Sequence, residues 1–291
     1  MQPEILSSFQ SGRDGSGSLQ PRAGFLRVAV CIYVCWLIPS LILLATGFFP
    51  SEESAGAQSR DYCIRLLLAA WLTMLILERD FGWKRALGAA LIVIFGAGMV
   101  EIIGEISGFP FGHFIYTEKL SGRLFGSVPW VVPIGWFVFV INAYLVCCAL
   151  MAIFTQEVSW DSQLLLVLMT AMIVTLLDLV LEPVAMNVEQ YRYWLERDRS
   201  YYGVPVSSFI GWFTVTSVLA GILSFQLNPA RAGQVARRHR LSTGWISLGL
   251  LASIGLPLAI QNWQVAQYTP VLVALNMIGG LAIGLAYVSG K

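Results

Sequence analysis

The sequence predicts an all-α membrane protein, a polytopic bundle of about eight transmembrane helices. Three observations lead to this prediction: an apolar composition, eight apolar runs long enough to cross a bilayer, and an internal parallel repeat over the third to sixth runs. Of the 291 residues, 57% are hydrophobic and 12% are charged, against about 45–50% and about 25% in soluble domains. The mean hydropathy of +0.71 agrees with a membrane protein.

The apolar runs define the expected spans. Runs able to cross about 30 Å of hydrocarbon lie at 25–49, 62–78, 86–106, 128–154, 163–183, 207–228, 244–262 and 269–288. The second run is short and contains Arg65, so seven spans remain an alternative. The first run is too long for the apolar core of a signal peptide and is taken as a span. We therefore expect a disordered cytoplasmic tail at 1–24 and a single transmembrane domain at 25–288.

The positive charges predict the orientation. Lys and Arg gather before the first run, between the second and third, and between the sixth and seventh, the last two groups being Arg79, Lys84, Arg85 and Arg231, Arg237, Arg238, Arg240. By the positive-inside rule both termini are cytoplasmic, in a bacterial inner or thylakoid-type membrane, and loops 107–127 and 184–206 face the opposite compartment. Their many aromatic residues suit interfacial or re-entrant segments. The net charge of +1 gives no electrostatic basis for binding nucleic acid.

An internal repeat relates the third and fourth runs to the fifth and sixth. An offset of 76 places "VPWVVPIGWF" (128–137) on "VPVSSFIGWF" (204–213), and an offset of 77 upstream pairs Tyr116 with Tyr193. The same offset pairs Glu105 with Glu182 and Glu101 with Asp178, which chance matches rarely do. The halves are about 86–154 and 163–228. Because two spans separate equivalent residues, the repeat is parallel, with its axis along the membrane normal.

The paired acids are the main functional signal. Residues four apart share a helix face, so each pair can point into one cavity between helices. A charged side chain inside a span costs about 2.5–3.5 kcal/mol and by default marks a functional site. Burial and a neighbouring carboxylate both favour the protonated form of a carboxyl group. Such a pair can therefore hold a proton at neutral pH.

A structural interpretation of the acids stays open. The four carboxyl groups could instead lie at the interface, reaching water or pairing with Arg123, Arg192 or Arg197. The aromatic residues Trp136 and Trp212 are typical of interface anchors, but they could also line a substrate tunnel.

Other chemistries have no support in the sequence. There are only two histidines, His113 and His239, so a His-rich metal site cannot form, and we expect no metal. Acyl, phosphoryl and dinucleotide motifs are missing, and we expect no cofactor. The five cysteines show no C-x-x-C spacing.

Two long strings resemble a known family. "FGHFIYTEKLSGRLFGSVPWVVPIGW" and "DLVLEPVAMNVEQYRYWLERDRSYYGVPVSSFIGWF" are similar to the membrane carotenoid hydratases of the CruF type, with a likeness over about 62–288. The resemblance implies addition of water to the 1,2 (or 1′,2′) double bond of an acyclic carotenoid ψ-end by a cofactor-independent hydro-lyase. The implied substrate is a membrane-dissolved γ-carotene-type carotene or a bacterioruberin precursor. Other enzymes of the carotenoid pathway would be its partners.

This chemistry suits the acids. Protonation of the alkene at C2 gives a tertiary cation at C1, which a carboxylate can stabilise while it orients water. We expect Glu105 and Glu182 to be catalytic with Glu101 and Asp178 in support, and Tyr116, Tyr193, Trp136 and Trp212 to bind substrate, partly through cation–π attraction. The alternatives are a lycopene-type cyclase, which starts with the same protonation, and a transporter or lipid-binding protein whose acids carry protons or cations.

Overall fold

The computed structural model describes residues 20–46, 51–120, 122–151, 160–197, 200–227 and 237–290. Within these ranges the chain forms eight helices and four short strands, which confirms the predicted helical bundle. The helices are α1 (Gln20–Ala45), α2 (Ser51–Phe81), α3 (Trp83–Ser107), α4 (Val131–Met151), α5 (Trp160–Asn187), α6 (Val206–Leu227), α7 (Arg237–Gln264) and α8 (Tyr268–Ser289). The strands are β1 (Phe114–Tyr116), β2 (Arg123–Leu124), β3 (Val128–Pro129) and β4 (Arg192–Trp194). Residues 1–19, most of the expected tail, lie outside the described residues.

Seven of the eight helices in the described chain are long and apolar enough to cross a membrane, and α2 is the exception. This helix has 31 residues, many more than its apolar run at 62–78. The side chain of Arg65 pairs with Asp61 one turn earlier, at 3.1 Å. The charge within the run is thus compensated inside the helix itself.

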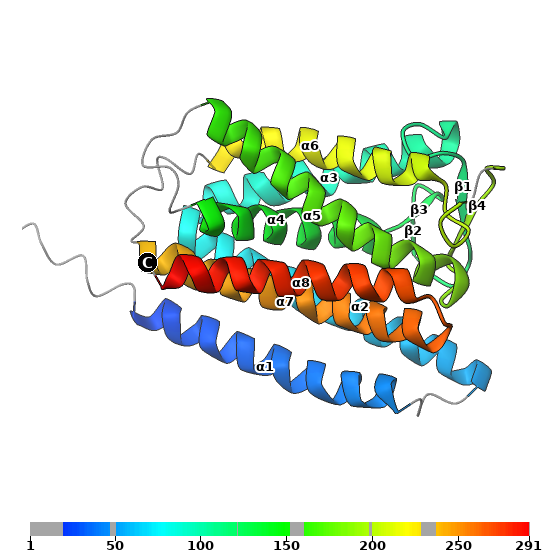
Figure 1. Ribbon diagram of the computed structural model, residues 1–291, viewed down its shortest axis with the longest axis horizontal. Helices are drawn as coiled ribbons and strands as arrows, with labels where there is room; N and C mark the ends of the chain where they lie inside the picture. Colours follow the sequence, from blue (N-terminus) through cyan, green and yellow to red (C-terminus); the bar gives the residue numbers. More distant parts are fainter. Residues whose placement is uncertain are drawn as a thin grey trace, which may run out of the picture.

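Successive helices run in opposite directions along the bundle (Figure 1). The start of α1 and the end of α8 lie at one end, together with the turn between α2 and α3, where the basic residues Lys84 and Arg85 follow Gly82. The strands lie at the other end. We call these the terminal end and the strand end. This arrangement places the two long loops at the opposite end of the bundle from the start of α1 and the end of α8.

The repeat is visible in the helix packing. Helix α3 packs on α4 and α5 on α6, while α3 also packs on α6 and α4 on α5, so the four helices close a ring. Helices α3 and α5 run in the same direction (Figure 1), as a parallel repeat requires. Their buried positions follow the 77-residue offset: Ala97 matches Val174, Glu101 matches Asp178, and Gly104 is buried in α3 as Leu181 is in α5.

The strands join the two halves at the strand end. Strand β1 pairs antiparallel with β4, so that Tyr116 lies opposite Arg192 and Ile115 opposite Tyr193. Side chains alternate along a strand, and in β4 Arg192 and Trp194 are buried while Tyr193 is exposed. A two-fold axis through an antiparallel pair keeps each side chain on its own face, so the structural equivalent of buried Tyr116 is a buried residue of β4 and not the exposed Tyr193. The offset along the strands is therefore even, like the 76 that applies from Val128 onwards.

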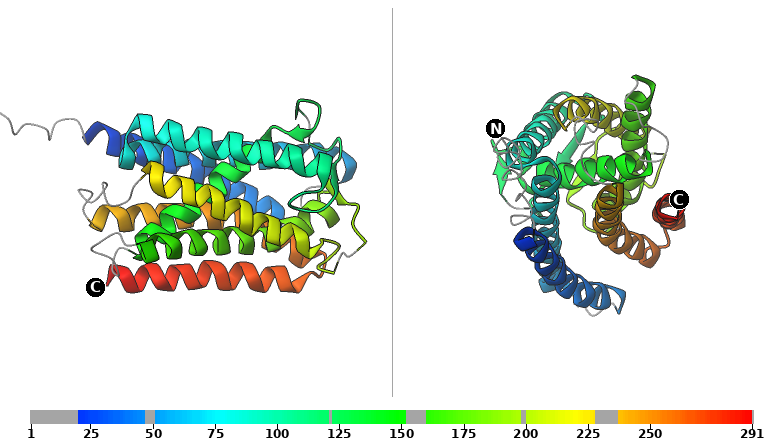
Figure 2. Two further views of the ribbon diagram at one scale, coloured as in Figure 1. Left: turned by 90° about the horizontal axis from the view of Figure 1, so that it is seen from above. Right: turned by 90° about the vertical axis from the view of Figure 1, so that its left-hand side faces the viewer.

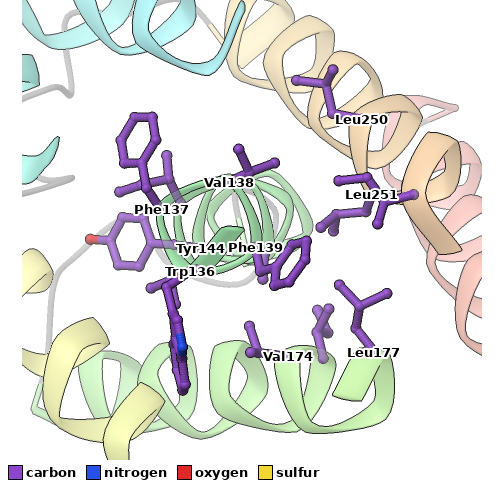
Figure 3. Close-up of a cluster of buried hydrophobic side chains, with 14 of the residues drawn as sticks. Trp136, Phe137, Val138, Phe139, Tyr144, Val174, Leu177, Leu250 and Leu251 are labelled. Carbon is purple, nitrogen blue, oxygen red and sulfur yellow. The ribbon is translucent and has the colours of Figure 1, made fainter. Parts of the chain in front are cut away.

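Helix α4 forms the centre of the bundle. Figure 3 looks along α4, with Val174 and Leu177 of α5 on one side and Leu250 and Leu251 of α7 on another. Almost every residue from Val131 to Met151 is buried. In the end-on view of Figure 2, α1 lies at the edge of the molecule, where it packs against α2 and α7. The site described below lies in the ring of α3 to α6, on the strand side of this core.

Candidate active site

One arginine binds two acids at the strand end of the ring. Arg192 Nη2 donates to Glu101 Oε2 at 2.9 Å, and Arg192 Nη1 donates to Glu182 Oε1 at 2.5 Å. All three side chains are buried, with exposures of 3%, 0% and 0%. Burial alone would lower the pKa of the Arg192 guanidinium, but Glu101 and Glu182 raise it well above its usual value. The guanidinium is therefore a permanent positive charge.

Aromatic rings enclose the guanidinium. Its Cζ atom lies 3.9 Å from the ring centre of Phe114 and 5.1 Å from those of Tyr116 and Trp194. The rings offer cation–π attraction to the buried guanidinium. Strand pairing sets this geometry, since alternate residues of β1 and β4 point to the same face.

Glu101 has a complete set of donors. Its Oε1 accepts a hydrogen bond from Trp136 Nε1 at 2.9 Å, and its Oε2 also accepts one from the Tyr116 hydroxyl at 2.8 Å. Burial raises the pKa of Tyr116 well above its usual value, so the hydroxyl keeps its proton and acts as a donor. Glu182 Oε2 accepts from Trp194 Nε1 at 3.2 Å. Donors of this kind offset part of the cost of burying the two glutamates.

Asp178 differs from both glutamates. It lies one turn before Glu182 in α5 and is 1% exposed, and neither carboxylate oxygen has a hydrogen-bond partner among the described residues. The charges of Glu182, Arg192 and Glu101 all act on it. Three carboxylates around one guanidinium would leave two net negative charges in a buried site, which is very costly. This excess favours retention of at least one proton within the cluster.

A cavity of about 40 Å³ adjoins the cluster. This volume is enough to hold water, for which about 10–15 Å³ suffices. The polar part of its wall comes from Glu101, Arg192 and tyrosines, and the two tryptophans Trp136 and Trp212 form another part. Their rings stack at 3.8 Å with an angle of 10° between planes. The remaining lining is apolar: Leu120, Val131, Val132, Gly135, Phe139 and Leu181.

The structure brings together only some of the predicted site residues. Glu101, Asp178, Glu182, Tyr116, Trp136 and Trp212 lie in or beside the cluster. Glu105 does not: it is half-buried and accepts a hydrogen bond from Ser127 in the loop before β3. Tyr193 points away and is 37% exposed. The acid that shares Arg192 with Glu182 is thus Glu101, one turn deeper than Glu105.

Comparison with known proteins shows the family of the chain. The family model described as "Carotenoid biosynthesis protein" matches residues 62–281. The chain belongs to this family. It is also 30% identical over 217 residues to the bisanhydrobacterioruberin hydratase of Haloarcula japonica, a match that covers 67% of this chain and 68% of that protein. No solved structure matches it.

The match to the carotenoid biosynthesis proteins covers the whole candidate site. It includes α3 to α6, both paired strands and the cavity, whereas α1 lies outside it. Within this region, among the described residues, no three His, Cys, Asp or Glu side chains gather as metal ligands would.

The sequence of this carotenoid biosynthesis protein does not show that two hydrogen-bond donors, Arg192 and Trp194, belong to the site. Trp194 was not a candidate, and Arg192 was only one of three arginines that could neutralise an acid. The available signal was the alternation of Arg192, Tyr193 and Trp194, but a strand of three residues is too short to distinguish from a loop.

Proposed function

We propose that the chain is a carotenoid 1,2-hydratase that adds water to the terminal C1=C2 bond of an acyclic ψ-end. The observation that carries this proposal is the cluster of three buried carboxyl groups around one guanidinium, beside a water-sized cavity with largely apolar walls. The hydratase relative supports the reaction class.

The cluster supplies the proton. A protonated carboxyl group donates to C2, and the π electrons of the double bond form the new C–H bond and leave a tertiary cation at C1. Water then adds its lone pair to C1 and gives a proton back to the cluster, so the protein is unchanged after each cycle. Glu101, Asp178 and Glu182 are the groups that hold and return this proton. Glu105 lies outside the cluster and is the weaker candidate.

The cavity wall suits both the substrate and the cation. Aliphatic residues such as Val132 and Leu181 can contact a hydrocarbon end group. The stacked rings of Trp136 and Trp212 present π-electron density to a developing positive charge. Fixed carboxylates stabilise the same charge without reorganisation.

The decisive experiment is expression in hosts that accumulate lycopene, γ-carotene or bisanhydrobacterioruberin, followed by mass analysis of the pigments. A hydratase gives a product heavier by one water. An unchanged mass with altered absorption would show a cyclase, and unchanged pigment in all three hosts would contradict both enzymes. The double variant Glu101→Gln, Glu182→Gln is the inactive control, because it keeps the shape of both side chains and removes both acids.

A further inference from the structure

One hydrogen bond of the first half of the ring has no counterpart within the described part of the second half. In the first half, Trp136 Nε1 donates to Glu101 at 2.9 Å. The equivalent residues of the second half are Trp212 and Asp178, which are 3% and 1% exposed. Among the described residues, neither the Trp212 Nε1 atom nor either Asp178 oxygen has a hydrogen-bond partner.

The side-chain lengths explain the difference. Asp178 has one methylene group fewer than Glu101, so its carboxyl group stops short of the indole that the longer side chain reaches. The helices themselves are equivalent, because buried positions follow the same offsets and the two indoles stack on each other. An acceptor, Asp178, and an N–H donor, Trp212, both unpartnered within the described ranges, thus stand at the positions of a contacting pair in the first half. Buried polar groups of this kind are commonly joined by an ordered water molecule.

The second half is also more polar on either side of Trp212 along α6. Ser208 and Thr216 lie one turn before and one turn after Trp212, on the same face of α6. Both are buried, and neither hydroxyl has a partner in the described part of the chain. The first half has Val132 and Val140 at these positions.

Other hydroxyl groups of α6 behave differently. Thr214 and Ser217 each donate to a carbonyl oxygen of their own helix, at 2.8 Å. The Tyr201 hydroxyl, at the strand end of the molecule, is likewise unpartnered among the described residues. Unpartnered polar atoms of the second half, in the described part of the chain, therefore include those of the half-buried Tyr201 and of Ser208, Trp212 and Thr216.

We propose that Asp178 and Trp212 hold the water molecule that becomes the hydroxyl group of the product. This inference rests on the proposed function and assigns one step within it. The Trp212 N–H donates to the water oxygen, and the water donates one hydrogen to an Asp178 oxygen. The second lone pair of the water stays available for C1.

The proton balance closes within the cluster. When the water oxygen bonds to C1, its proton passes to Asp178. Transfer of this proton from Asp178 to the glutamate that protonated C2 restores that acid, and Glu182 lies one turn from Asp178 on the same face of α5. Asp178 therefore acts as the base for water, while the initial protonation of C2 belongs to a glutamate.

An experiment in deuterium oxide distinguishes protonation of C2 from addition of water to C1. Membranes containing each variant and carotenoid are incubated in deuterium oxide, and both the hydrated product and the deuterium in recovered substrate are measured. We expect Trp212→Phe and Asp178→Asn to lower hydration by about a hundredfold, the low end for general acid–base catalysis. Deuterium in recovered substrate should rise, because the cation still forms and can only lose a proton again.

A matched variant controls for folding. The double change Ser208→Val, Thr216→Val gives α6 the residues that already pack at the equivalent positions of α4. It should lower hydration and raise deuterium incorporation while carotenoid binding and the thermal unfolding midpoint stay near wild type.

Three results would overturn the inference. One is full hydration by both Trp212→Phe and Asp178→Asn. Another is loss of deuterium incorporation together with hydration, which would make Asp178 the proton donor. The third is an unchanged product ratio in the double Val variant. Failure of the proposed function looks different, since the wild-type protein itself would then give no hydrated product.

Discussion

Glu101 and Glu182 occupy non-equivalent positions in the two repeats, yet the guanidinium of Arg192 binds both. The equivalent of Glu101 is Asp178, and that of Glu182 is Glu105, which points to Ser127 instead. The arginine thus connects α3 to α5 and makes the site asymmetric, although the helices around it follow a two-fold arrangement. Asymmetry lets chemically similar acids take different roles.

Replacing Arg192 should strongly destabilise the protein. Arg192→Met leaves Glu101 and Glu182 buried without their common cation, and breaking a buried pair in this way costs about 3–5 kcal/mol. Thermal unfolding in detergent measures the change. The control is Glu118→Gln, which removes the exposed partner of Arg123 and should cost less than about 1 kcal/mol. Equal effects of both variants would show that the buried network contributes no more than a surface pair.

Glu101 lies one turn deeper than Glu105, and mutation of each tests which of the two belongs to the catalytic pair. We expect Glu101→Gln to lower turnover by at least about a hundredfold, because Glu101 lines the cavity. Glu105→Gln should change turnover little, since Glu105 is bound to Ser127. The measurement is the conversion of pigment by each variant at equal protein levels. The opposite result, an inactive Glu105 variant and an active Glu101 variant, would place the reaction nearer the loop.

The hydroxyl group of Tyr116 should contribute to stability independently of its ring. Tyr116→Phe removes a donor to a carboxylate, worth about 1.5–3 kcal/mol. Because burial raises the pKa of Tyr116, this contribution is complete below the unfolded pKa of about 10 and is lost only as the pH rises through the higher folded pKa. The difference in unfolding free energy between wild type and variant should therefore be constant from pH 6 to 8. Tyr193→Phe, at an exposed ring, is the control and should have little effect.

Hydration should need neither metal nor redox cofactor, since protonation of an alkene and capture of water leave all oxidation states balanced. Activity in membranes should survive chelators and anaerobic conditions. Product formation with and without chelator is the measurement. Loss of activity in the presence of a chelator, with recovery on addition of a divalent ion, would refute this prediction.

Labelling of introduced cysteines tests the orientation. In a variant without native cysteines, Glu118→Cys at the strand end should react with a membrane-impermeant maleimide in intact cells. Gly290→Cys at the terminal end should react only after the membrane is opened. Labelling of Gly290→Cys alone in intact cells would show the reverse orientation.

The apolar runs were sufficient to predict the helices, because a bilayer demands long apolar segments. The run at 86–106 became α3 (Trp83–Ser107), and the run at 163–183 became α5 (Trp160–Asn187), each longer by a few polar or interfacial residues. Helix α2 extends much further than its run, since helix hydrogen bonds do not require apolar side chains. A hydropathy pattern therefore finds the membrane part of a helix and not its ends.

The site was harder to predict, because short strands determine it. The repeat located the level of the acids, and Glu101, Asp178 and Glu182 do lie together. Which acid meets Arg192 depends on the pairing of β1 with β4, and a shift of one residue reverses the face of a strand. The offset that paired Tyr116 with Tyr193 differs by one residue from the structural one, so the sequence comparison selected the exposed tyrosine.

The pairing of β1 with β4 also has a consequence for biogenesis. Strand β1 leaves the ribosome two helices ahead of its partner, so Glu101 has no bound cation until α4 and α5 have been made and Arg192 has reached the strand end. A nascent chain that ends after α4 would carry an unneutralised acid near the strand end. Arrival of β4 converts this acid into half of an ion network, and the same event fastens the two halves together. Formation of the Arg192 network is thus coupled to complete membrane integration of the fifth helix.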